Sequence, residues 1–347
     1  MDKFRVDLYS DTNTRPSAAM RQACADAEVG NEQAGEDPTV NRLCEMVADL
    51  MGKEAGLYAP SGSMCNEIAY RVWCRQGDEI ILHRTAHAVH AETGAPAALS
   101  GLMLHSLDGP RGQFSAEQVR TAVRQPLTNH RPRSRLVSIE QTSNQGGGTI
   151  WPLEQIQDIE KAAKDSKLYM HMDGARLLNA VVETRITATE YAAPFDSAWI
   201  DFSKGLGAPV GAVLVGSSEF IAEAWRCKQQ FGGAMRQAGI IAAACIFALE
   251  HNVDRLTEDH ENARYFASLI GDLPGIKLEL DRIETNLVFF DVSATGMSGI
   301  DIANRLRQRG IRIGVSAPMR MRAVTHLDVA RADIELAANE LKATLNE

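Results

Sequence analysis

The chain has 347 residues, of which 45% are hydrophobic and 23% charged, so it is long enough for a sizeable core and more than one domain. Its formal net charge of -9, without basic runs interleaved with aromatic residues, excludes a nucleic-acid-binding surface. No signal peptide is visible, and the longest apolar run, at 238–249, is too short to span a bilayer. The 6 cysteines show no Cys-x-x-Cys spacing, which is typical of reduced thiols. We therefore expect a cytoplasmic protein without a membrane or nucleic-acid partner.

Apolar and polar segments alternate in the strand-then-helix order of an α/β protein. A helix is predicted over 37–51, because Asp37 suits its N-cap, Pro38 suits its first position and apolar residues recur at helical spacing. A second helix is predicted from Pro60-Ser61-Gly62-Ser63 to about residue 74. Further strands are predicted at 79–82, 102–105, 136–139, 168–172, 198–202 and 211–215, and helices at 116–124, 153–164 and 175–182.

Three long helical patterns follow, at 219–230, 236–251 and 253–270. Beyond Leu273-Pro274-Gly275 the order changes to strand, strand, helix, strand, strand, helix, which predicts an α+β unit. Its strands are expected at 276–280, 285–290, 311–314 and 321–325, and its helices at 299–309 and 330–345. We therefore predict a large domain over 1–251, including an N-terminal segment, and a small C-terminal α+β domain over 252–347.

One stretch carries the strongest indication of chemistry. In Asp201-Phe202-Ser203-Lys204-Gly205-Leu206-Gly207-Ala208-Pro209-Val210-Gly211, Lys204 follows a short apolar strand on a Gly-rich turn that a bulky cofactor could approach closely. Upstream, Asp173 ends another apolar strand. A lysine that forms a Schiff base and an aspartate that keeps a pyridine nitrogen protonated are the pair that a pyridoxal 5'-phosphate (PLP) enzyme needs. The alternative is an ordinary turn and an ordinary strand end.

The turn Pro60-Ser61-Gly62-Ser63 offers free backbone N–H groups and two hydroxyls to a phosphate at a helix N-terminus. Taken alone, this turn favours an ordinary capped helix start. No Gly-Lys-Ser/Thr follows it, which excludes a Walker-type loop. The run Gly146-Gly147-Gly148 is a weaker phosphate candidate, for which a loop turn is the preferred interpretation.

The histidines His83, His87 and His90 fall within one short segment. Because Glu92 is the only nearby acid that could support a metal ligand, we predict no metal site there. A ring stacked on a cofactor, or a base, is the better functional role for one of the three. A structural hydrogen bond is the interpretation for the other two.

Two arginines are candidates for binding a substrate. Arg176 follows Asp173 at the carboxyl end of a strand, where ligands gather in open α/β sheets. Arg322 lies on an otherwise apolar strand of the small domain, where its guanidinium could bind a carboxylate across the domain cleft. A surface charge on an edge strand is the alternative for Arg322.

Together these motifs resemble the PLP-dependent threonine aldolases of the β-eliminating lyase group, which have the aspartate aminotransferase fold (fold type I). The resemblance covers almost the whole chain, and it implies an α/β large domain with a mostly parallel sheet. The matching pieces are Asp7-Leu8-Tyr9-Ser10-Asp11-Thr12-Asn13-Thr14-Arg15-Pro16, Gly35-Glu36-Asp37-Pro38-Thr39-Val40-Asn41, Ala59-Pro60-Ser61-Gly62-Ser63, Ala86-His87, His171-Met172-Asp173-Gly174-Ala175-Arg176, Ser203-Lys204-Gly205-Leu206-Gly207-Ala208-Pro209-Val210-Gly211, Met235-Arg236-Gln237-Ala238-Gly239 and Val324-Thr325-His326-Leu327-Asp328.

The resemblance implies a role for each matched residue. Lys204 would carry the internal aldimine, Asp173 would pair with the pyridine nitrogen and His87 would stack on the ring. The phosphate would be held by Ser61, Gly62 and Ser63, and by Arg236 of a neighbouring subunit, since members are homodimers or homotetramers with sites at subunit interfaces. The substrate carboxylate would be bound by Ser10, Arg176 and Arg322, with Arg176 also beside the cofactor.

Two departures from the family pattern concern the substrate. Ser143, in Glu140-Gln141-Thr142-Ser143-Asn144, stands where members usually carry a histidine that contacts the β-hydroxyl side of the substrate. Ala34 stands where they usually carry a tyrosine. Both changes are expected to alter the same pocket, with Ser143 as a substrate contact.

The resemblance implies retro-aldol cleavage of a β-hydroxy-α-amino acid (threonine, allo-threonine or a bulkier analogue) to glycine and an aldehyde. Without the usual histidine, the base would be His87 or a water held near Ser143. Two alternatives stay open. One is another PLP reaction on the same scaffold, such as β-elimination or racemisation, and the other is a PLP-binding protein that has lost catalysis.

Overall fold

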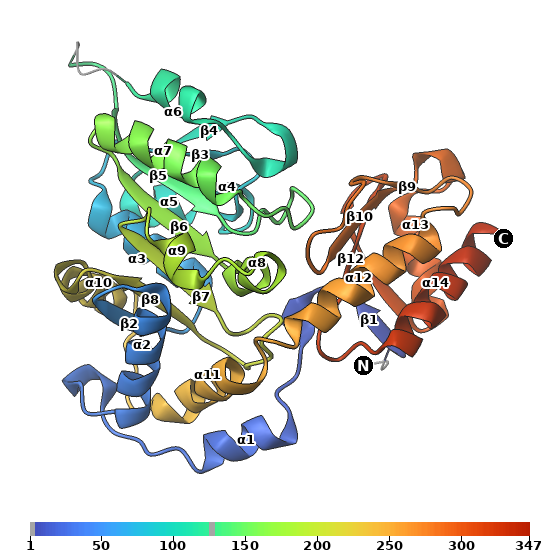
Figure 1. The fold of residues 1–347 in the computed structure, drawn as a ribbon, viewed down its shortest axis with the longest axis horizontal. Helices are drawn as coiled ribbons and strands as arrows, with labels where there is room; N and C mark the ends of the chain where they lie inside the picture. The colour runs from blue at the N-terminus through green and yellow to red at the C-terminus, as the bar shows by residue number, and fades with distance from the viewer. Residues whose placement is uncertain (1–3, 125–128) are drawn as a thin grey trace.

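Figure 1 shows two bodies of unequal size in the computed structural model, which describes residues 4–124 and 129–347. The large body is built on a seven-stranded sheet in the order β2-β8-β7-β6-β5-β3-β4. The strands β7, β6, β5, β3 and β4 are parallel, whereas β8 runs antiparallel to both its neighbours. The strands are β2 (Ala55–Ala59), β3 (Asp78–His83), β4 (Met103–Leu107), β5 (Arg133–Glu140), β6 (Tyr169–Gly174), β7 (Ser197–Asp201) and β8 (Ala212–Gly216).

Helices cover both faces of this sheet, because successive residues of its central strands are buried on opposite sides. In β8, Val213 and Val215 pack into a core shared with α2, α7 and α11, while Ala212 and Leu214 pack against α3 and α10. The helices of the large body are α1 (Ala18–Ala25), α2 (Pro38–Met51), α3 (Gly62–Trp73), α4 (His87–His90), α5 (Ala95–Ser100), α6 (Ala116–Ala122), α7 (Leu153–Asp165), α8 (Leu177–Thr184), α9 (Ala188–Ala192), α10 (Ser218–Gln230) and α11 (Gly239–His251).

The small body is an α+β unit with its own core. Its sheet has the order β1-β11-β12-β10-β9, and α12 leads into it from the large body (Figure 1). Its elements are β1 (Val6–Leu8), α12 (Leu256–Ile270), β9 (Lys277–Leu278), β10 (Leu287–Asp291), α13 (Gly299–Gln308), β11 (Ile311–Ala317), β12 (Arg320–Val324) and α14 (Arg331–Leu345). The predicted alternation of strands and helices in this unit is confirmed.

The N-terminal segment departs from the predicted division of the chain. We assigned residues 1–251 to the large domain, but β1 pairs in parallel with β11, and Val6 and Leu8 are buried in the small core. A strand of three residues carries no local pattern that could reveal a partner so far along the chain. Nor were α1, β2, α4, α5 and α9 predicted from the sequence.

A local sequence signal explains where α2 begins. The carboxylate of Asp37 accepts the N–H of Val40 at 3.1 Å, so Asp37 is the predicted N-cap of α2, followed by Pro38.

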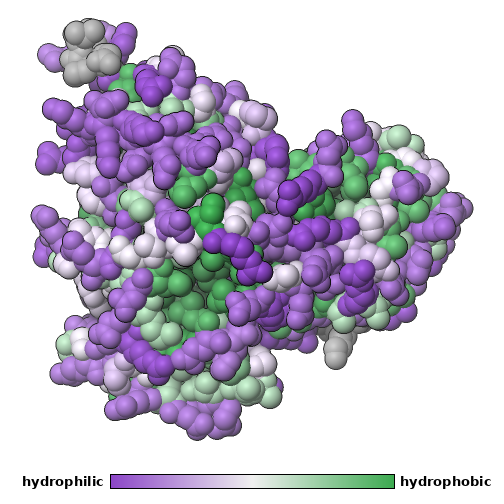
Figure 2. Space-filling model, in the orientation of Figure 1, coloured by the Kyte–Doolittle hydropathy of each residue, from purple (hydrophilic) through white to green (hydrophobic). Residues whose placement is uncertain are grey.

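Figure 2 shows hydrophilic residues over most of one face, with hydrophobic residues gathered across the middle of the large body. Within the part of the chain that the structure describes, no helix is both long and apolar enough to cross a membrane.

Candidate active site

The predicted chemical residues meet at one edge of the large sheet. Because β3, β5, β6 and β7 are parallel, their carboxyl ends lie at the same edge. His87 follows β3, Glu140 ends β5, Asp173 stands near the end of β6, and Lys204 follows β7. The topology therefore brings together residues that are well separated in the sequence.

Lys204 is held on a closed turn. Its Nζ lies 3.0 Å from Oδ2 of Asp201, and its side chain is only 18% exposed. Oδ1 of Asp201 accepts hydrogen bonds from the N–H and the hydroxyl of Ser203. The carbonyl of Lys204 accepts the N–H of Gly207 and the hydroxyl of Thr14, at 2.9 Å each. Lys204 is thus a positioned amine with its backbone fixed on both sides.

Asp173 is buried and hydrogen-bonded through both of its carboxylate oxygens. Oδ2 accepts the side-chain N–H of Asn66 at 2.9 Å, and Oδ1 accepts the backbone N–H of Ala175 at 3.1 Å. Burial raises the pKa of Asp173, and the charges of Lys204 and His87 and the bond from Asn66 oppose that rise. A ligand with a cationic ring nitrogen would add a further partner favouring the ionised carboxylate.

His87 presents a partly open ring above this edge. Its Nδ1 lies 2.7 Å from Oε1 of Glu92, and the side chains of His87 and Glu92 are 38% and 1% exposed. The bond with Glu92 raises the pKa of His87, against the effect of burial. The backbone N–H of His87 donates to the carboxylate of Glu140. Burial and the charge of Asp173 raise the pKa of Glu140 to about 7. The ring of His87 is therefore anchored at one nitrogen and accessible elsewhere.

The other two histidines of that segment point to different partners. His83 bonds through its two ring nitrogens to the hydroxyl of Thr85 and the carbonyl of Gly109, and His90 bonds to the carbonyl of Arg84. No group of three His, Cys, Asp or Glu side chains that could hold a metal ion occurs in residues 4–124 and 129–347.

The predicted phosphate turn lies beside Lys204. Ser61 caps α3 by accepting the N–H of Met64 at 3.3 Å, and the N–H groups of Gly62 and Ser63 bond to no described residue. Gly62 is required here, because a Cβ would lie 2.1 Å from the Trp199 ring. The centroid of that same ring lies 5.9 Å from Nζ of Lys204. The positive N-terminal end of α3 and the lysine thus both lie near the same indole ring.

The guanidinium of Arg176 already forms an ion pair with Asp11. Its guanidinium makes two hydrogen bonds to Asp11, at 2.7 and 2.8 Å, and both side chains are buried. Burial alone would raise the pKa of Asp11, but the charge and hydrogen bonds of Arg176 hold that pKa well below its usual range. Asn286 of the small body also donates to Asp11, at 3.1 Å. The pair therefore joins α8, the N-terminal segment and the small body.

Arg322 is the half-buried cation of the site that forms no ion pair with a described residue. It donates to the side-chain oxygen of Asn144 at 3.2 Å and to the carbonyl of Tyr9 at 3.3 Å. Burial and the charge of Arg176 lower the pKa of Arg322. Ser10 lies next to Tyr9, and its hydroxyl bonds to that of Thr12 at 2.8 Å. A carboxylate would complete the coordination of Arg322.

Comparisons with known proteins identify the family of the chain. The family model described as β-eliminating lyase matches residues 7–295. The low specificity L-threonine aldolase of Escherichia coli strain K12 is 38% identical over 336 residues, which cover 96% of this chain and 98% of that protein. The chain belongs to the β-eliminating lyase family, among its threonine aldolases.

Other relatives and solved structures extend this result. A probable low-specificity L-threonine aldolase of Arabidopsis thaliana is 36% identical over 334 residues, covering 95% of this chain and 94% of that protein. A structure of Leishmania major threonine aldolase superposes with a TM-score of 0.84 at 18% identity, covering 98% of this chain and 99% of that one. Fold type I, expected from the sequence, is thereby confirmed.

In this β-eliminating lyase, three predicted residues lie apart from the cluster or turn away from it. The hydroxyl of Ser143 packs against Gly112, where a Cβ would lie 1.9 Å from it. Ala34 is exposed at the end of a 3-10 helix (Glu32–Ala34). The Arg236 side chain is also exposed and bonds to no described residue, while its carbonyl accepts the N–H of Glu32 at 2.9 Å.

The sequence analysis missed residues that complete the site from within. Asn66, Glu92, Asp11 and Glu140 each bond to a predicted residue, yet none was assigned a role in the site. Asp11 and Glu140 lie inside stretches that align with motifs of the family, and this position in a motif is the signal that could have revealed them. Asn66 lies in the middle of α3, where a polar residue carries no such signal.

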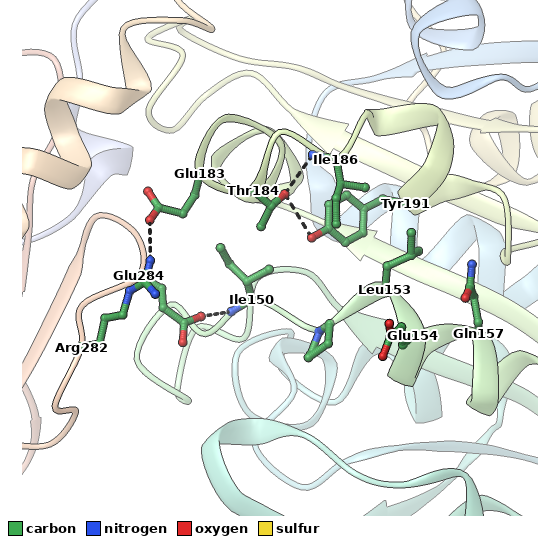
Figure 3. Close-up of a pocket in the computed structure, with 11 residues that line it drawn as sticks. Ile150, Leu153, Glu154, Gln157, Glu183, Thr184, Ile186, Tyr191, Arg282 and Glu284 are labelled. Atoms are coloured by element: carbon green, nitrogen blue, oxygen red, sulfur yellow. Dashed lines mark hydrogen bonds and ion pairs between the residues drawn. The ribbon is translucent and has the colours of Figure 1, made fainter.

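A pocket of about 620 Å³ lies away from these residues, where α7, α8 and α9 face the small body (Figure 3). In Figure 3, Glu183 bonds to Arg282, Glu284 to the N–H of Ile150, and Thr184 to Tyr191. Glu154 adds a third acid to this lining. With acids outnumbering Arg282, this pocket does not suit a phosphate.

Proposed function

We propose that the chain is a PLP-dependent aldolase that cleaves a β-hydroxy-α-amino acid to glycine and an aldehyde. The observation that carries the proposal is the meeting of Lys204, Asp173 and the open ring of His87 at one sheet edge, beside the N-terminus of α3. The family membership of the chain and the names of its relatives support the same activity.

The residues present fit the cofactor. The free N–H groups of Gly62 and Ser63, with the hydroxyls of Ser61 and Ser63, would hold its phosphate. Asp173 would accept a hydrogen bond from the protonated pyridine nitrogen, the ring of His87 would cover the pyridine, and Lys204 would supply the amine. When bound, the cofactor accepts the electron pair released at the α-carbon of the substrate.

The substrate carboxylate would bind to Arg322, with Ser10 beside it. Unlike Arg176, Arg322 forms no ion pair with a described residue, and its planar fork suits a carboxylate. Arg176 already shares two hydrogen bonds with Asp11, so we assign it a smaller part in substrate binding and a contact with the cofactor. Fixing the carboxylate from the small body would orient the bond that breaks.

A base must take the proton of the β-hydroxyl group. His87 is our first candidate, because Glu92 holds its Nδ1 while the ring is 38% exposed. A water near Ser143 is the second candidate. If the cofactor-loaded His87→Ala variant kept full activity, the water would be favoured.

The proposal includes a homodimer or homotetramer. Arg236 is exposed and bonds to no described residue, which leaves it free to reach the phosphate in a neighbouring subunit. The ion pair of Glu32 with Lys228, together with the N–H of Met235, fixes the loop that carries Arg236. Cys24, Cys44, Cys65, Cys74, Cys227 and Cys245 are free thiols, which supports a cytoplasmic location.

The test is a visible absorbance spectrum of the purified protein with added PLP, followed by product analysis over a panel of β-hydroxy-α-amino acids. Borohydride should fix the cofactor onto Lys204, as peptide mass mapping can establish. Glycine and an aldehyde should appear in equal amounts. A keto acid with ammonia would establish β-elimination instead, and a chain that takes up no PLP would overturn the proposal.

A further inference from the structure

Two buried acids, Glu67 and Glu92, contact each other near His87. Glu67 comes from α3 and Glu92 from the segment after α4, and both residues are buried. Both carboxylate oxygens of Glu67, and Oε2 of Glu92, accept no hydrogen bond from a described residue. Buried carboxylate oxygens without a donor are costly, so this contact needs an explanation.

A single proton shared by the carboxyl groups of Glu67 and Glu92 explains their contact. Burial raises the pKa of Glu67 to about 8, together with the charge of Glu92 and a hydrogen bond to it. The other ionisable groups close to the pair are His87, Asp173, Tyr70 and Cys65. Only His87 among them can carry a positive charge, and it contacts Glu92 and not Glu67.

Glu92 has two further donors on its other oxygen. Oε1 accepts from Nδ1 of His87 at 2.7 Å and from Nδ2 of Asn66 at 2.9 Å. Both bonds stabilise the ionised form of Glu92. Glu67 makes no such bond, so the shared proton belongs on Glu67.

Asn66 links Glu92 to Asp173 in a fixed orientation. Its Nδ2 donates to both carboxylates, and its Oδ1 accepts from Nε1 of Trp199 at 2.7 Å and from Nε2 of His171 at 3.2 Å. The indole N–H can only donate, so Oδ1 must face Trp199 and Nδ2 must face the acids. Every donor and acceptor of the Asn66 side chain is therefore used.

We infer that Glu67 donates a proton to Glu92 and thereby keeps Glu92 an ionised acceptor that positions His87 directly and Asp173 through Asn66. This inference rests on the proposed function for its meaning, since His87 and Asp173 are the residues assigned to the cofactor ring. Glu67 and Glu92 are positioning residues. Their effect on His87 is to retain the proton on Nδ1 and to leave Nε2 as the nitrogen that can exchange a proton.

Matched amide variants test the placement of the proton. Glu67→Gln keeps a donor toward Glu92 and the same charge, so the pKa of His87 should stay within about 0.3 units of the parent. Glu92→Gln removes the charge that His87 contacts, so that pKa should fall by about one unit or more. The readout is the ¹⁵N shift of the His87 ring against pH, assigned with His87→Gln, in protein with and without PLP.

Each outcome decides the inference. A change in the pKa of His87 in Glu67→Gln, with no change in Glu92→Gln, would place the charge on Glu67 and overturn the inference. Equal large changes in the pKa of His87 in both variants would mean that both acids are ionised. No change in either variant would mean that the pair does not act on His87. Either of those results overturns it as well.

Glu67→Leu provides a second variant if Glu92→Gln does not fold. Without a donor at residue 67, Oε2 of Glu92 stays buried and unpartnered, which disfavours the negative charge that His87 contacts, so the pKa of His87 should fall as in Glu92→Gln. Because the titration is also run without PLP, its result stands even if PLP fails to bind. A failure to bind PLP would count against the proposed function alone.

Discussion

The two sides of the site are built in different ways. The cofactor side lies within the large body, where Asn66 alone makes four hydrogen bonds of 2.7–3.2 Å to buried partners. The substrate side lies between the bodies, where Arg322 makes bonds of 3.2 and 3.3 Å to a side-chain oxygen and a carbonyl. The first is densely hydrogen-bonded around Asp173 and His87, with the N–H groups of Gly62 and Ser63 left without a described partner, whereas the second depends on how the two bodies meet. We therefore expect changes near Arg322 to affect substrate binding more than cofactor binding.

The largest effect is expected at the amine itself. Lys204→Ala should lower kcat by at least about a thousandfold, because it removes the nucleophile. Asp201 would lose its cationic partner, but the other bonds of the cofactor side remain. Steady-state assays should be compared with Lys161→Ala, an exposed lysine on α7. Activity within about tenfold of the parent would remove Lys204 from the mechanism.

On the substrate side, Arg322→Ala should lower kcat/KM by about a hundredfold, corresponding to about 3 kcal/mol for a lost charge-assisted contact. Arg322→Lys should recover only part of this, because the planar fork is lost. PLP affinity should be unchanged in both, which is the feature that separates the two sides. Arg331→Ala, an exposed arginine of the small body, is the control. A parallel loss of PLP affinity would show that the two sides are not independent.

The cofactor side should respond as a unit to Asn66→Ala. Four buried groups would each lose a partner, so the free energy of unfolding should fall by about 2–3 kcal/mol, and the PLP dissociation constant should rise by about tenfold. Denaturant unfolding without PLP and titration with PLP measure the two quantities. The exposed amide variant Asn304→Ala is the control. Tight PLP binding by a folded Asn66→Ala protein would contradict the proposed support.

A pH dependence follows from His171, which burial keeps neutral by lowering its pKa from 6.5 to about 3. Between these values the unfolded chain binds a proton that the folded chain does not, so stability is lost as pH falls. His171→Gln should reduce the loss between pH 6.5 and pH 5 by about 2 kcal/mol. Urea unfolding of the PLP-free proteins at both pH values measures the difference. Equal losses in both proteins would show that His171 does not titrate in this way.

The smallest effect is expected at Ser143→Ala. The Ser143 hydroxyl packs against Gly112, so its loss should change kcat/KM by less than about threefold for each substrate of the panel. A selective loss for one β-hydroxy-α-amino acid would instead establish Ser143 as a substrate contact. Gly112→Ala is not a suitable control, because its φ of 77° disfavours a side chain.

The sequence predicted the residues that stand at strand ends. Lys204 and Asp173 each follow an apolar run and sit in motifs with glycine, and parallel strands then bring them to one edge. Asn66 and Glu67 could not be found in this way. They lie within α3 beside Cys65 and Ile68, and only the later strands that carry Asp173 and Trp199 show that this side of the helix is buried. Hydrogen-bond saturation is a property of the packed fold and leaves no local trace.

The pairing of β1 with β11 also governs when the site can form during synthesis. Val6 pairs with Ile311, and the segment that follows β1 supplies Asp11 to Arg176 and Thr14 to the carbonyl of Lys204. The first residues to leave the ribosome must therefore wait for nearly the last before they can be placed. Closing so long a loop is slow, since its entropy cost precedes the contacts that offset it. A nascent chain that ends before residue 311 can build the large sheet and α3, yet it carries an unfinished active site.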